Sequence, residues 1–387
     1  MKIAFVSNYF NHHQRPFANA LHKICEGEYM FVSTSEISSE RKSLGYGEKN
    51  IPEYVKYTYK DAEEAKACQN FIDEADVVIY GSAPYAMLEN RLKAGKLTFK
   101  YCERPYKKGV SIIKMPMHVL RAYKKYTRFK NFYVLCASAY TPVDFSKMLA
   151  FIGKTYKWAY FTEVKKYDNV DEIIGLKHSA SILWVARLIG LKHPEIPIAV
   201  AKRLKADGYD FKLSMIGNGE LEDATRELIE REGVADCVEM LGAMKPHEVR
   251  EHMEKSEIFL FTSDKNEGWG AVLNESMNSA CAVVANSAIG SVPFLINDGE
   301  NGYIYKDGDV DDIYNKVKSL LDNADERKRL GKNAYKTMKE EWNAENAAEK
   351  FVALCEKMLA GEYKPFPYAS GVCSKAEILK DNWYKNS

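Results

Sequence analysis

Residues 258–281 carry the pattern around which the rest of this 387-residue chain can be ordered. The apolar run 258–261 is typical of a buried strand, and a short polar loop containing Gly268 and Gly270 follows it. A helix is expected over about 271–279. Glycines directly before a helix permit close backbone approach and leave amides beside the positive end of the helix dipole. The stretch therefore predicts an anion site, most simply for phosphate.

Two acidic residues accompany these glycines. Glu267 lies in the loop, and Glu275 lies eight positions later on the expected helix. Carboxylates repel a neighbouring phosphate unless they accept hydrogen bonds from hydroxyl groups of the same ligand. A sugar nucleotide meets both requirements. On these residues alone, an ordinary strand–loop–helix with surface acids is an equally good interpretation.

The spacing resembles the Glu-x7-Glu signature of the retaining glycosyltransferases of family 4, which have the GT-B fold. The segment ESMNSACAVVAN also resembles the helix and following strand of that family. The resemblance implies that Glu267 binds donor-sugar hydroxyls, that the amides of 268–270 approach the sugar and diphosphate, and that Glu275 binds the ribose diol. The chain departs from the family at Ala280 and Ala282, where Gly and Pro are usual.

The composition is that of a soluble globular protein, with 46% hydrophobic and 28% charged residues, and the length suits two domains. No apolar run of about 18 residues is present, and the N-terminal run is too short for a signal peptide. The eight cysteines contain no Cys-x-x-Cys pair, which favours buried free thiols in a reducing cytoplasm. The net charge of +1 leaves electrostatic steering to local charge segregation, and no nucleic-acid partner is expected.

Strand and helix patterns alternate in both halves of the chain, which is typical of parallel sheets with helices on both faces. Strands are expected near 2–7, 29–33, 76–80, 97–102, 132–137 and 157–161, and then near 182–186, 211–216, 237–241, 257–261 and 282–285. The polar stretch 163–171 is the expected linker. The sequence thus predicts two Rossmann-like α/β domains, 1–165 and 172–360. The resemblance implies the GT-B fold, with the domains facing each other across a cleft and a tail, about 361–387, returning to the first domain.

Two cations follow the first strand of the second half. Arg187 and Lys192 lie at a strand end and a helix start, with Pro194 in the first turn. Such cations are often simply solvated, but the segment resembles one in which the family holds the donor diphosphate with an Arg and a Lys. The pair Gly217 and Gly219 is a weak signal that also fits a plain turn. The resemblance places these donor contacts: Gly217, Gly219, Ala243, Met244, Gly268, Trp269, Gly270 and Glu275.

The first half lacks a dinucleotide fingerprint, because no glycine lies between Asn8 and Gln14. Asn8, His13 and Gln14 are instead candidates to contact the phosphates or the acceptor. Family members often carry a His near the reacting sugar in this domain. No match is found here, and Glu103 is preferred over His118 as its replacement.

Asp307-Gly308-Asp309 matches the Asp-x-Asp of metal-dependent glycosyltransferases of another fold. It directly precedes an expected helix, where Asp309 is a favourable N-cap. We interpret it as a cap, and predict no catalytic metal and no cofactor besides the substrate.

Every charged residue from Arg104 to Lys130 is positive. On a helical wheel of the expected helix 115–130, Arg121, Lys124, Lys125 and Arg128 share one side, and apolar residues including Tyr123 share the other. One interpretation is a solvated basic face above a core-facing stripe. The other is a face for anionic lipid or a polyprenyl-diphosphate acceptor, which would place the protein peripherally on the inner face of the plasma membrane.

Together with these features, the resemblance implies a metal-independent retaining glycosyltransferase, hexosyltransferase in type, that acts in polysaccharide or glycoconjugate synthesis. It would move a sugar from a UDP- or GDP-linked donor to a saccharide or lipid-linked acceptor. The alternatives are a sugar-nucleotide epimerase of the same fold and a non-catalytic sugar-nucleotide-binding module. The intact set Glu267, Glu275, Arg187 and Lys192 argues against the module.

Overall fold

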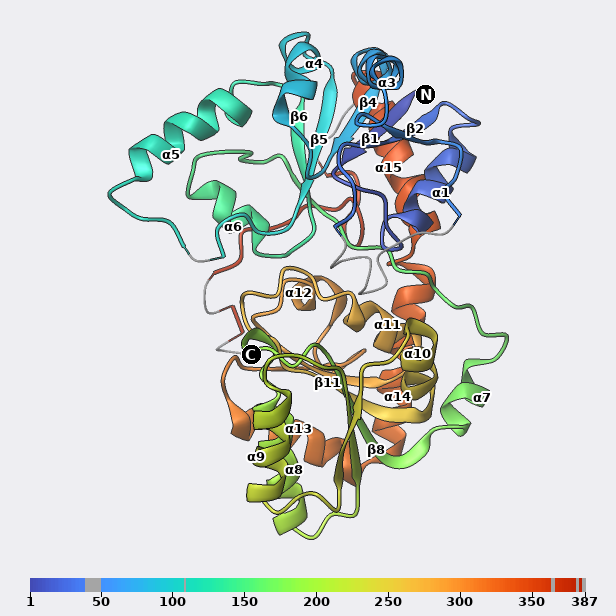
Figure 1. Cartoon of the computed structure of the whole chain (residues 1–387), viewed down its shortest axis with the longest axis vertical. Helices are drawn as coiled ribbons and strands as arrows, with labels where there is room; N and C mark the ends of the chain where they lie inside the picture. The colour runs from blue at the N-terminus through green and yellow to red at the C-terminus, as the bar shows by residue number, and fades with distance from the viewer. Residues whose placement is uncertain (39–49, 108, 363–365, 381–382, 385–387) are drawn as a thin grey trace. The chain divides into compact units, whose positions relative to one another are not determined.

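The computed structural model describes residues 1–38, 50–107, 109–362, 366–380 and 383–384, which form two compact units (Figure 1). The first unit combines Met1–Glu163 with Trp342–Lys380, and the second combines Val164–Glu341 with the described tail residues Trp383 and Tyr384. Both units are therefore discontinuous in sequence, and the end of the tail, expected to join the first domain, belongs to the second unit.

The described part of the first unit contains a seven-stranded parallel sheet in the order β3-β2-β1-β4-β5-β6-β7. All five residues of its interior strand β1 are buried, as expected for a parallel sheet covered on both faces. Its strands are β1 (Ile3–Ser7), β2 (Tyr29–Ser33), β3 (Val55–Tyr57), β4 (Val77–Tyr80), β5 (Leu97–Cys102), β6 (Phe132–Cys136) and β7 (Thr155–Lys157). Its described helices are α1 (Arg15–Ile24), α3 (Ala62–Glu74), η2 (Tyr85–Leu88), α4 (Glu89–Lys93), α5 (Met115–Ala122), the π-helical η3 (Tyr123–Thr127), α6 (Thr141–Ser146) and α15 (Ala344–Leu359).

The second unit has a six-stranded parallel sheet in the order β10-β9-β8-β11-β12-β13. Its strands are β8 (His178–Val185), β9 (Lys212–Ile216), β10 (Val238–Gly242), β11 (Ser256–Phe261), β12 (Ala282–Asn286) and β13 (Tyr303–Tyr305). Its helices are α7 (Val170–Gly175), η4 (Gly190–Lys192), α8 (Glu195–Ala206), α9 (Glu222–Arg231), α10 (Pro246–Lys255), α11 (Val272–Asn278), α12 (Val292–Leu295), α13 (Val310–Asp322) and α14 (Ala324–Glu340). The strand order reverses between β8 and β11, which defines a switch point at their carboxyl ends.

Both sheets are parallel and flanked by helices, so the prediction of two Rossmann-like α/β domains is confirmed. The short strands β3 and β13 were not expected, because three residues give too little periodicity to recognise. The strand expected at 157–161 is instead β7, Thr155–Lys157. The expected linker 163–171 already enters α7 at Val170.

The C-terminal helix α15 packs in the first unit, although the sequence placed residues up to 360 with the second domain (Figure 1). The reason is a cluster of aromatic rings. Phe351 lies 5.0 Å from Phe99 and 5.6 Å from Trp158, between ring centroids, and α15 also lies beside α1. Periodicity along the helix cannot reveal which of two sheets it covers.

The segment after α15 reaches the edge strand β7. Lys157 N donates to the Ser374 carbonyl at 2.8 Å, and Ala376 N donates to the Thr155 carbonyl at 3.0 Å. This pairing covers a sheet edge that would otherwise expose free backbone groups. Further on, Tyr384 donates to Asp298 Oδ2 of the second unit at 2.8 Å. Residues 363–365, 381–382 and 385–387 of the expected tail lie outside the described residues.

All eight cysteines carry free thiols. Among the described helices, none combines the length and the apolar character that a membrane crossing requires.

Candidate active site

The switch point of the second unit brings together the two loops that the sequence singled out. The loop after β8 carries Lys192, and the loop after β11 carries Glu267. Open parallel sheets bind ligands beyond the carboxyl ends of their strands at such a reversal.

Lys192 and Glu267 form an ion pair, with Lys192 Nζ donating to Glu267 Oε2. The Ser263 hydroxyl donates to the same carboxylate oxygen at 3.0 Å. The side chains of the pair are only 13% and 15% exposed. The attraction between the two opposite charges offsets the cost of removing them from water.

A chain of hydrogen bonds fixes the two loops against each other. Trp184 Nε1 donates to Thr262 Oγ1 at 2.8 Å, and Thr262 Oγ1 donates to the Lys192 carbonyl at 2.7 Å. Asp264 N donates to the Leu191 carbonyl at 3.0 Å. The two halves of the ion pair are therefore held in place by the backbone as well as by their own charges.

The loop before α11 requires glycine at 270. Gly270 has φ +82°, and a Cβ placed there would lie 2.2 Å from the Phe261 ring. In the part of the chain that the structure describes, the amides of Gly268 and Gly270 donate no hydrogen bond. Gly268 is buried, so its amide is a donor suited to a ligand. The Trp269 ring is fully buried, and its Nε1 donates to Asn274 Oδ1 at 2.9 Å.

Glu275 lies in the first turn of α11 and is half-buried. Burial raises the pKa of its carboxyl group, and the nearby positive charge of Arg250 opposes this shift only in part. No donor to its carboxylate is found among the described residues, whereas Arg250 Nη1 donates to Asn278 Oδ1 at 2.8 Å. A desolvated carboxylate without a donor is a natural acceptor for ligand hydroxyls.

The end of α11 shows how the chain accommodates alanine where the family that it resembles usually has glycine. Ala280 adopts the left-handed region with φ +54°. Its amide donates to the Met277 carbonyl, and Cys281 N donates to the Ser276 carbonyl, each at 3.1 Å. This is the hydrogen-bond pattern of a Schellman motif, so the helix ends in the usual way with an unusual residue. With seven residues, α11 is slightly shorter than the expected 271–279.

Gly217 and Gly219 have φ +141° and +156°, and each lies against the loop after β8. A Cβ at Gly217 would lie 1.8 Å from the Ala186 carbonyl oxygen, and one at Gly219 would lie 2.4 Å from that of Leu188. These glycines therefore have a packing role. Three other predicted residues occupy the same carboxyl-end side of the sheet: Arg187 is exposed after β8, Ala243 is exposed after β10, and Met244 is half-buried beside it.

In the first unit, the structure joins two predicted residues through one that sequence reasoning missed. Tyr160 Oη donates to Glu103 Oε1 at 2.7 Å, and the Tyr160 ring stacks on that of His13 with centroids 6.0 Å apart. Lys107 Nζ binds the other Glu103 oxygen at 2.9 Å. Burial, together with the neighbouring His12, lowers the pKa of His13 to about 3, so its imidazole is neutral. Asn8 lies in the same post-β1 segment as His13.

Tyr160 follows β7 by three residues. The strand expected at 157–161 included Tyr160, so the sequence did not show that it lies in the loop beyond a strand end. The alternative candidate His118 packs instead beside Tyr106, with ring centroids 5.9 Å apart.

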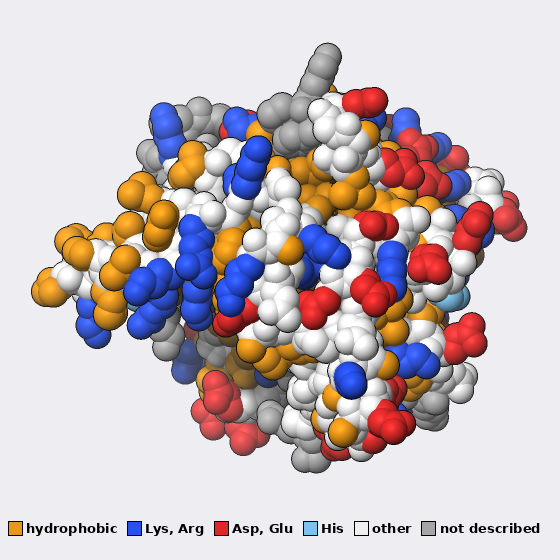
Figure 2. Space-filling model, turned by 90° about the horizontal axis from the view of Figure 1, so that it is seen from above, with side chains coloured by type: hydrophobic (Ala, Val, Ile, Leu, Met, Phe, Trp, Pro, Cys, Tyr) orange, Lys and Arg blue, Asp and Glu red, His pale blue; other side chains and the backbone are white. Residues whose placement is uncertain are grey.

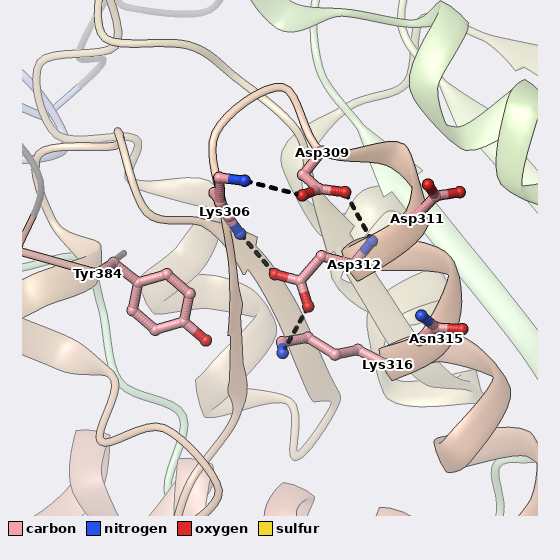
Figure 3. A pocket seen from close by; sticks show the side chains of 7 residues that line it. All are labelled: Lys306, Asp309, Asp311, Asp312, Asn315, Lys316 and Tyr384. Atoms are coloured by element: carbon pink, nitrogen blue, oxygen red, sulfur yellow. Dashed lines mark hydrogen bonds and ion pairs between the residues drawn. The ribbon is translucent and has the colours of Figure 1, made fainter. Parts of the chain in front are cut away.

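Asp309 acts as the N-cap of α13, as predicted. Its carboxylate accepts from Asp312 N at 3.0 Å and from Lys306 Nζ at 3.2 Å. Figure 3 shows these residues lining a cavity of about 360 Å³, with Asp312 also bound by Lys316. Asp307 Oδ1 likewise accepts a hydrogen bond from Asn286. Both acids of the Asp-x-Asp sequence therefore bind neighbouring groups of the protein. Across the described ranges, no group of three or more His, Cys, Asp or Glu residues is arranged to hold a metal.

Comparison with known proteins places this site in context. Residues 168–337 match the family model described as glycosyl transferases group 1, which spans nearly the whole second unit.

Two curated relatives are similar over shorter segments. A putative colanic acid biosynthesis glycosyltransferase, WcaL, of Salmonella typhimurium is 32% identical over 134 residues, 33% of each chain. The N-acetylgalactosamine-N,N'-diacetylbacillosaminyl-diphospho-undecaprenol 4-alpha-N-acetylgalactosaminyltransferase of Campylobacter jejuni is 31% identical over 156 residues, 40% of this chain and 41% of that one. The matches thus span about a third to two fifths of these relatives.

Solved structures are similar over almost the entire chain. Anabaena HepE, in complex with UDP, superposes with a TM-score of 0.67 at 15% identity, covering 93% of this chain and all of that one. The pneumococcal O-GlcNAc transferase GtfA, in complex with UDP and GlcNAc, gives 0.65 at 11% identity, covering 93% and 99%. The structural neighbours are GT-B glycosyltransferases, so the expected GT-B fold is confirmed.

Proposed function

We propose that this chain is a retaining glycosyltransferase that transfers a sugar from a UDP- or GDP-linked donor to a saccharide or polyprenyl-diphosphate-linked acceptor, without metal. The observation that carries the proposal is the Lys192–Glu267 pair at the switch point, beside a loop in which the amides of Gly268 and Gly270 donate no hydrogen bond among the described residues. The similarity of residues 168–337 to glycosyl transferases group 1 supports it.

Ligand binding would exchange partners within the pair. A donor diphosphate would take Lys192, and Glu267 would then accept hydrogen bonds from the donor sugar while Ser263 continues to donate to it. Arg187, which is exposed directly after β8, would bind the second phosphate. Preorganised cations and amides stabilise the charge that develops on a leaving diphosphate, which is the main catalytic requirement here.

Glu275 would bind the ribose. Two hydroxyls of a diol supply the donors that its half-buried carboxylate lacks. In the first unit, Glu103, Tyr160 and His13 would lie on the acceptor side, with Glu103 positioned by Lys107 and Tyr160. On the resemblance to family 4, no protein nucleophile is required, and the leaving phosphate accepts the acceptor proton on the same face.

The names of the relatives bear on the acceptor. They concern colanic acid synthesis and a diphospho-undecaprenol substrate, which supports a role in polysaccharide or glycoconjugate assembly with a lipid-linked acceptor. We therefore propose action at the inner face of the plasma membrane, from the cytoplasm.

The test is a panel of UDP-, GDP- and ADP-sugars, in which nucleoside diphosphate release is measured with and without saccharide and polyprenyl-diphosphate acceptors. Acceptor-dependent release in EDTA, with an α-linked product from an α-linked donor, would support the proposal. Acceptor-independent conversion of the sugar would indicate an epimerase, and binding without turnover would indicate a binding module.

Two variants test the assigned roles. Glu275→Ala should weaken binding of both the free nucleoside diphosphate and the donor, by about 1.5–3 kcal/mol, because both contain the ribose. Glu267→Ala should weaken only the sugar-bearing donor. Equal loss of free nucleotide in both variants would contradict the assignment.

A further inference from the structure

An arm of the first unit, residues 111–128, presents apolar and basic side chains together to solvent. It begins with a turn containing Ile112 and Ile113, which are 83% and 92% exposed. It continues through α5, in which only Ala122 is buried, and ends in the π-helical η3. Figure 1 shows α5 at the margin of the first unit, and in Figure 2 hydrophobic atoms and a group of Lys and Arg side chains lie side by side at that margin.

The charge of this region is one-sided. No Asp or Glu occurs between residues 105 and 143. The exposed basic residues of the arm are Lys114, Arg121, Lys124, Lys125 and Arg128. Lys108, which belongs to the same basic run, lies outside the described residues.

The exposure pattern of this helix fits the interpretation of a core-facing apolar stripe only in part. Among the apolar residues of that side Ala122 is buried, whereas Tyr123 is exposed. Met117 and Leu120 are also exposed, on the side of the helix that carries Lys124. The solvent-facing surface therefore combines apolar and cationic groups instead of being uniformly basic.

The inner end of the arm is firmly anchored. The Tyr126 ring packs on Phe151 and Phe145, with centroids 5.1 and 5.8 Å away, and Tyr85 Oη donates to the Lys125 carbonyl at 2.8 Å. The exposed isoleucines are thus presented by an ordered support.

The backbone of the tip is internally hydrogen-bonded. Lys114 N donates to the Ser111 carbonyl and Met115 N donates to the Ile112 carbonyl, each at 3.1 Å. A turn with such bonds can enter an apolar phase at a lower desolvation cost than an open loop.

We propose that this arm docks on an anionic phospholipid surface, with Ile112 and Ile113 inserted among the lipids and Arg121, Lys124, Lys125 and Arg128 over the headgroup phosphates. An acidic protein would satisfy the cations but not two adjacent, almost fully exposed isoleucines at the tip. Interfacial segments that combine an apolar insertion with flanking Lys and Arg bind anionic bilayers through both contributions. The inference does not depend on the proposed transfer reaction.

The test is co-sedimentation of the full chain with vesicles of phosphatidylcholine, either alone or mixed with an equal part of phosphatidylglycerol, at low salt. We expect binding to the mixed vesicles only. Changing Arg121, Lys124, Lys125 and Arg128 to Gln should reduce the partition coefficient about a hundredfold or more. Changing Ile112 and Ile113 to Ser should reduce it about tenfold or more, without loss of folding because both are exposed.

Two controls remove the same number of positive charges, or of exposed apolar side chains, elsewhere. One replaces the exposed lysines Lys23, Lys66, Lys328 and Lys336 by Gln, and the other replaces the exposed Leu176 and Ile378 by Ser. Both should bind like wild type. Wild type that stays in the supernatant, or controls that lose binding as much as the arm variants, would overturn the proposal. Donor turnover with a water-soluble acceptor, measured in parallel, tests the transfer reaction separately.

Discussion

The Lys192–Glu267 pair permits a quantitative prediction about the second unit. Removing one partner of a buried ion pair typically costs about 3–5 kcal/mol, because the other charge is left uncompensated. Here both side chains are slightly exposed, and Glu267 would keep its hydrogen bond from Ser263. We therefore expect Lys192→Met to lower the free energy of unfolding by about 2 kcal/mol. Arg187→Met removes the same charge from an exposed site and should change it by no more than about 0.5 kcal/mol.

A double-mutant cycle separates the pair from each residue alone. Lys192→Met combined with Glu267→Gln should recover about 1–2 kcal/mol relative to the sum of the single variants, because neither charge is then stranded. Hydrogen–deuterium exchange of peptides from β8 and β11 is the suitable assay. It reports the second unit by itself, whereas a chain with two units has no single unfolding free energy.

Two results would refute this reasoning: equal effects of Lys192→Met and Arg187→Met on stability, or additive effects of the single changes in the cycle.

The pair also predicts an effect on nucleotide binding. Because Glu267 occupies Lys192, Glu267→Gln should bind free nucleoside diphosphate more tightly than wild type does, as measured by calorimetry. Weaker binding would show that Glu267 itself contacts the nucleotide.

Three further variants probe the surroundings of the site. Gly331→Ala should destabilise the second unit by about 1–2 kcal/mol, since a Cβ there lies 2.4 Å from the Ala280 carbonyl oxygen. Gly175→Ala, whose Cβ meets no atom within 4 Å, is its control, and hydrogen–deuterium exchange of second-unit peptides is the measurement. Glu275→Gln should be more stable than wild type at pH 7. The folded-state pKa of Glu275 is raised, so this advantage should shrink as pH falls through that pKa towards about 4.5, and a constant difference in a pH series would contradict it. The pKa of His193 is raised because its contacts with Glu195 and Asp264 outweigh burial, which acts to lower it. Wild type should therefore be more stable than His193→Asn below about pH 6.5, and this advantage should fade as pH rises through the folded-state pKa of His193. A stability difference that grows with pH would refute the stabilising contacts of His193 with Glu195 and Asp264.

The sequence predicted those parts of the site that depend on local pattern. The run 258–261 was recognised as a strand, and the following loop and helix placed Glu267 and Glu275 correctly within their elements. The direct contact between Lys192 and Glu267 could not be predicted, because it depends on β8 and β11 being neighbours in the sheet. Tyr160 was missed for a similar reason, since its link to Glu103 spans 57 residues.

Departures from a family pattern were harder to interpret. Because Ala280 stands where glycine is usual, the sequence did not settle where α11 ends. The backbone hydrogen bonds of the Schellman motif show that Ala280 adopts the left-handed conformation that glycine normally supplies. The exposure of Ile112 and Ile113 could not be predicted from the sequence either, because an apolar pair next to a helix is normally buried.

The discontinuity of the first unit has a consequence for synthesis on the ribosome. Its sheet needs Phe351 to cover Phe99 and Trp158, and β7 needs the segment around Ser374 at its edge. Both are translated only after residues 164–341, which form nearly all of the second unit. Domains that emerge first usually fold first, but here the nascent first unit must wait with an uncovered aromatic surface and an open strand edge. The sheet and helices of residues 164–341 are the part of this chain that can fold earlier during synthesis.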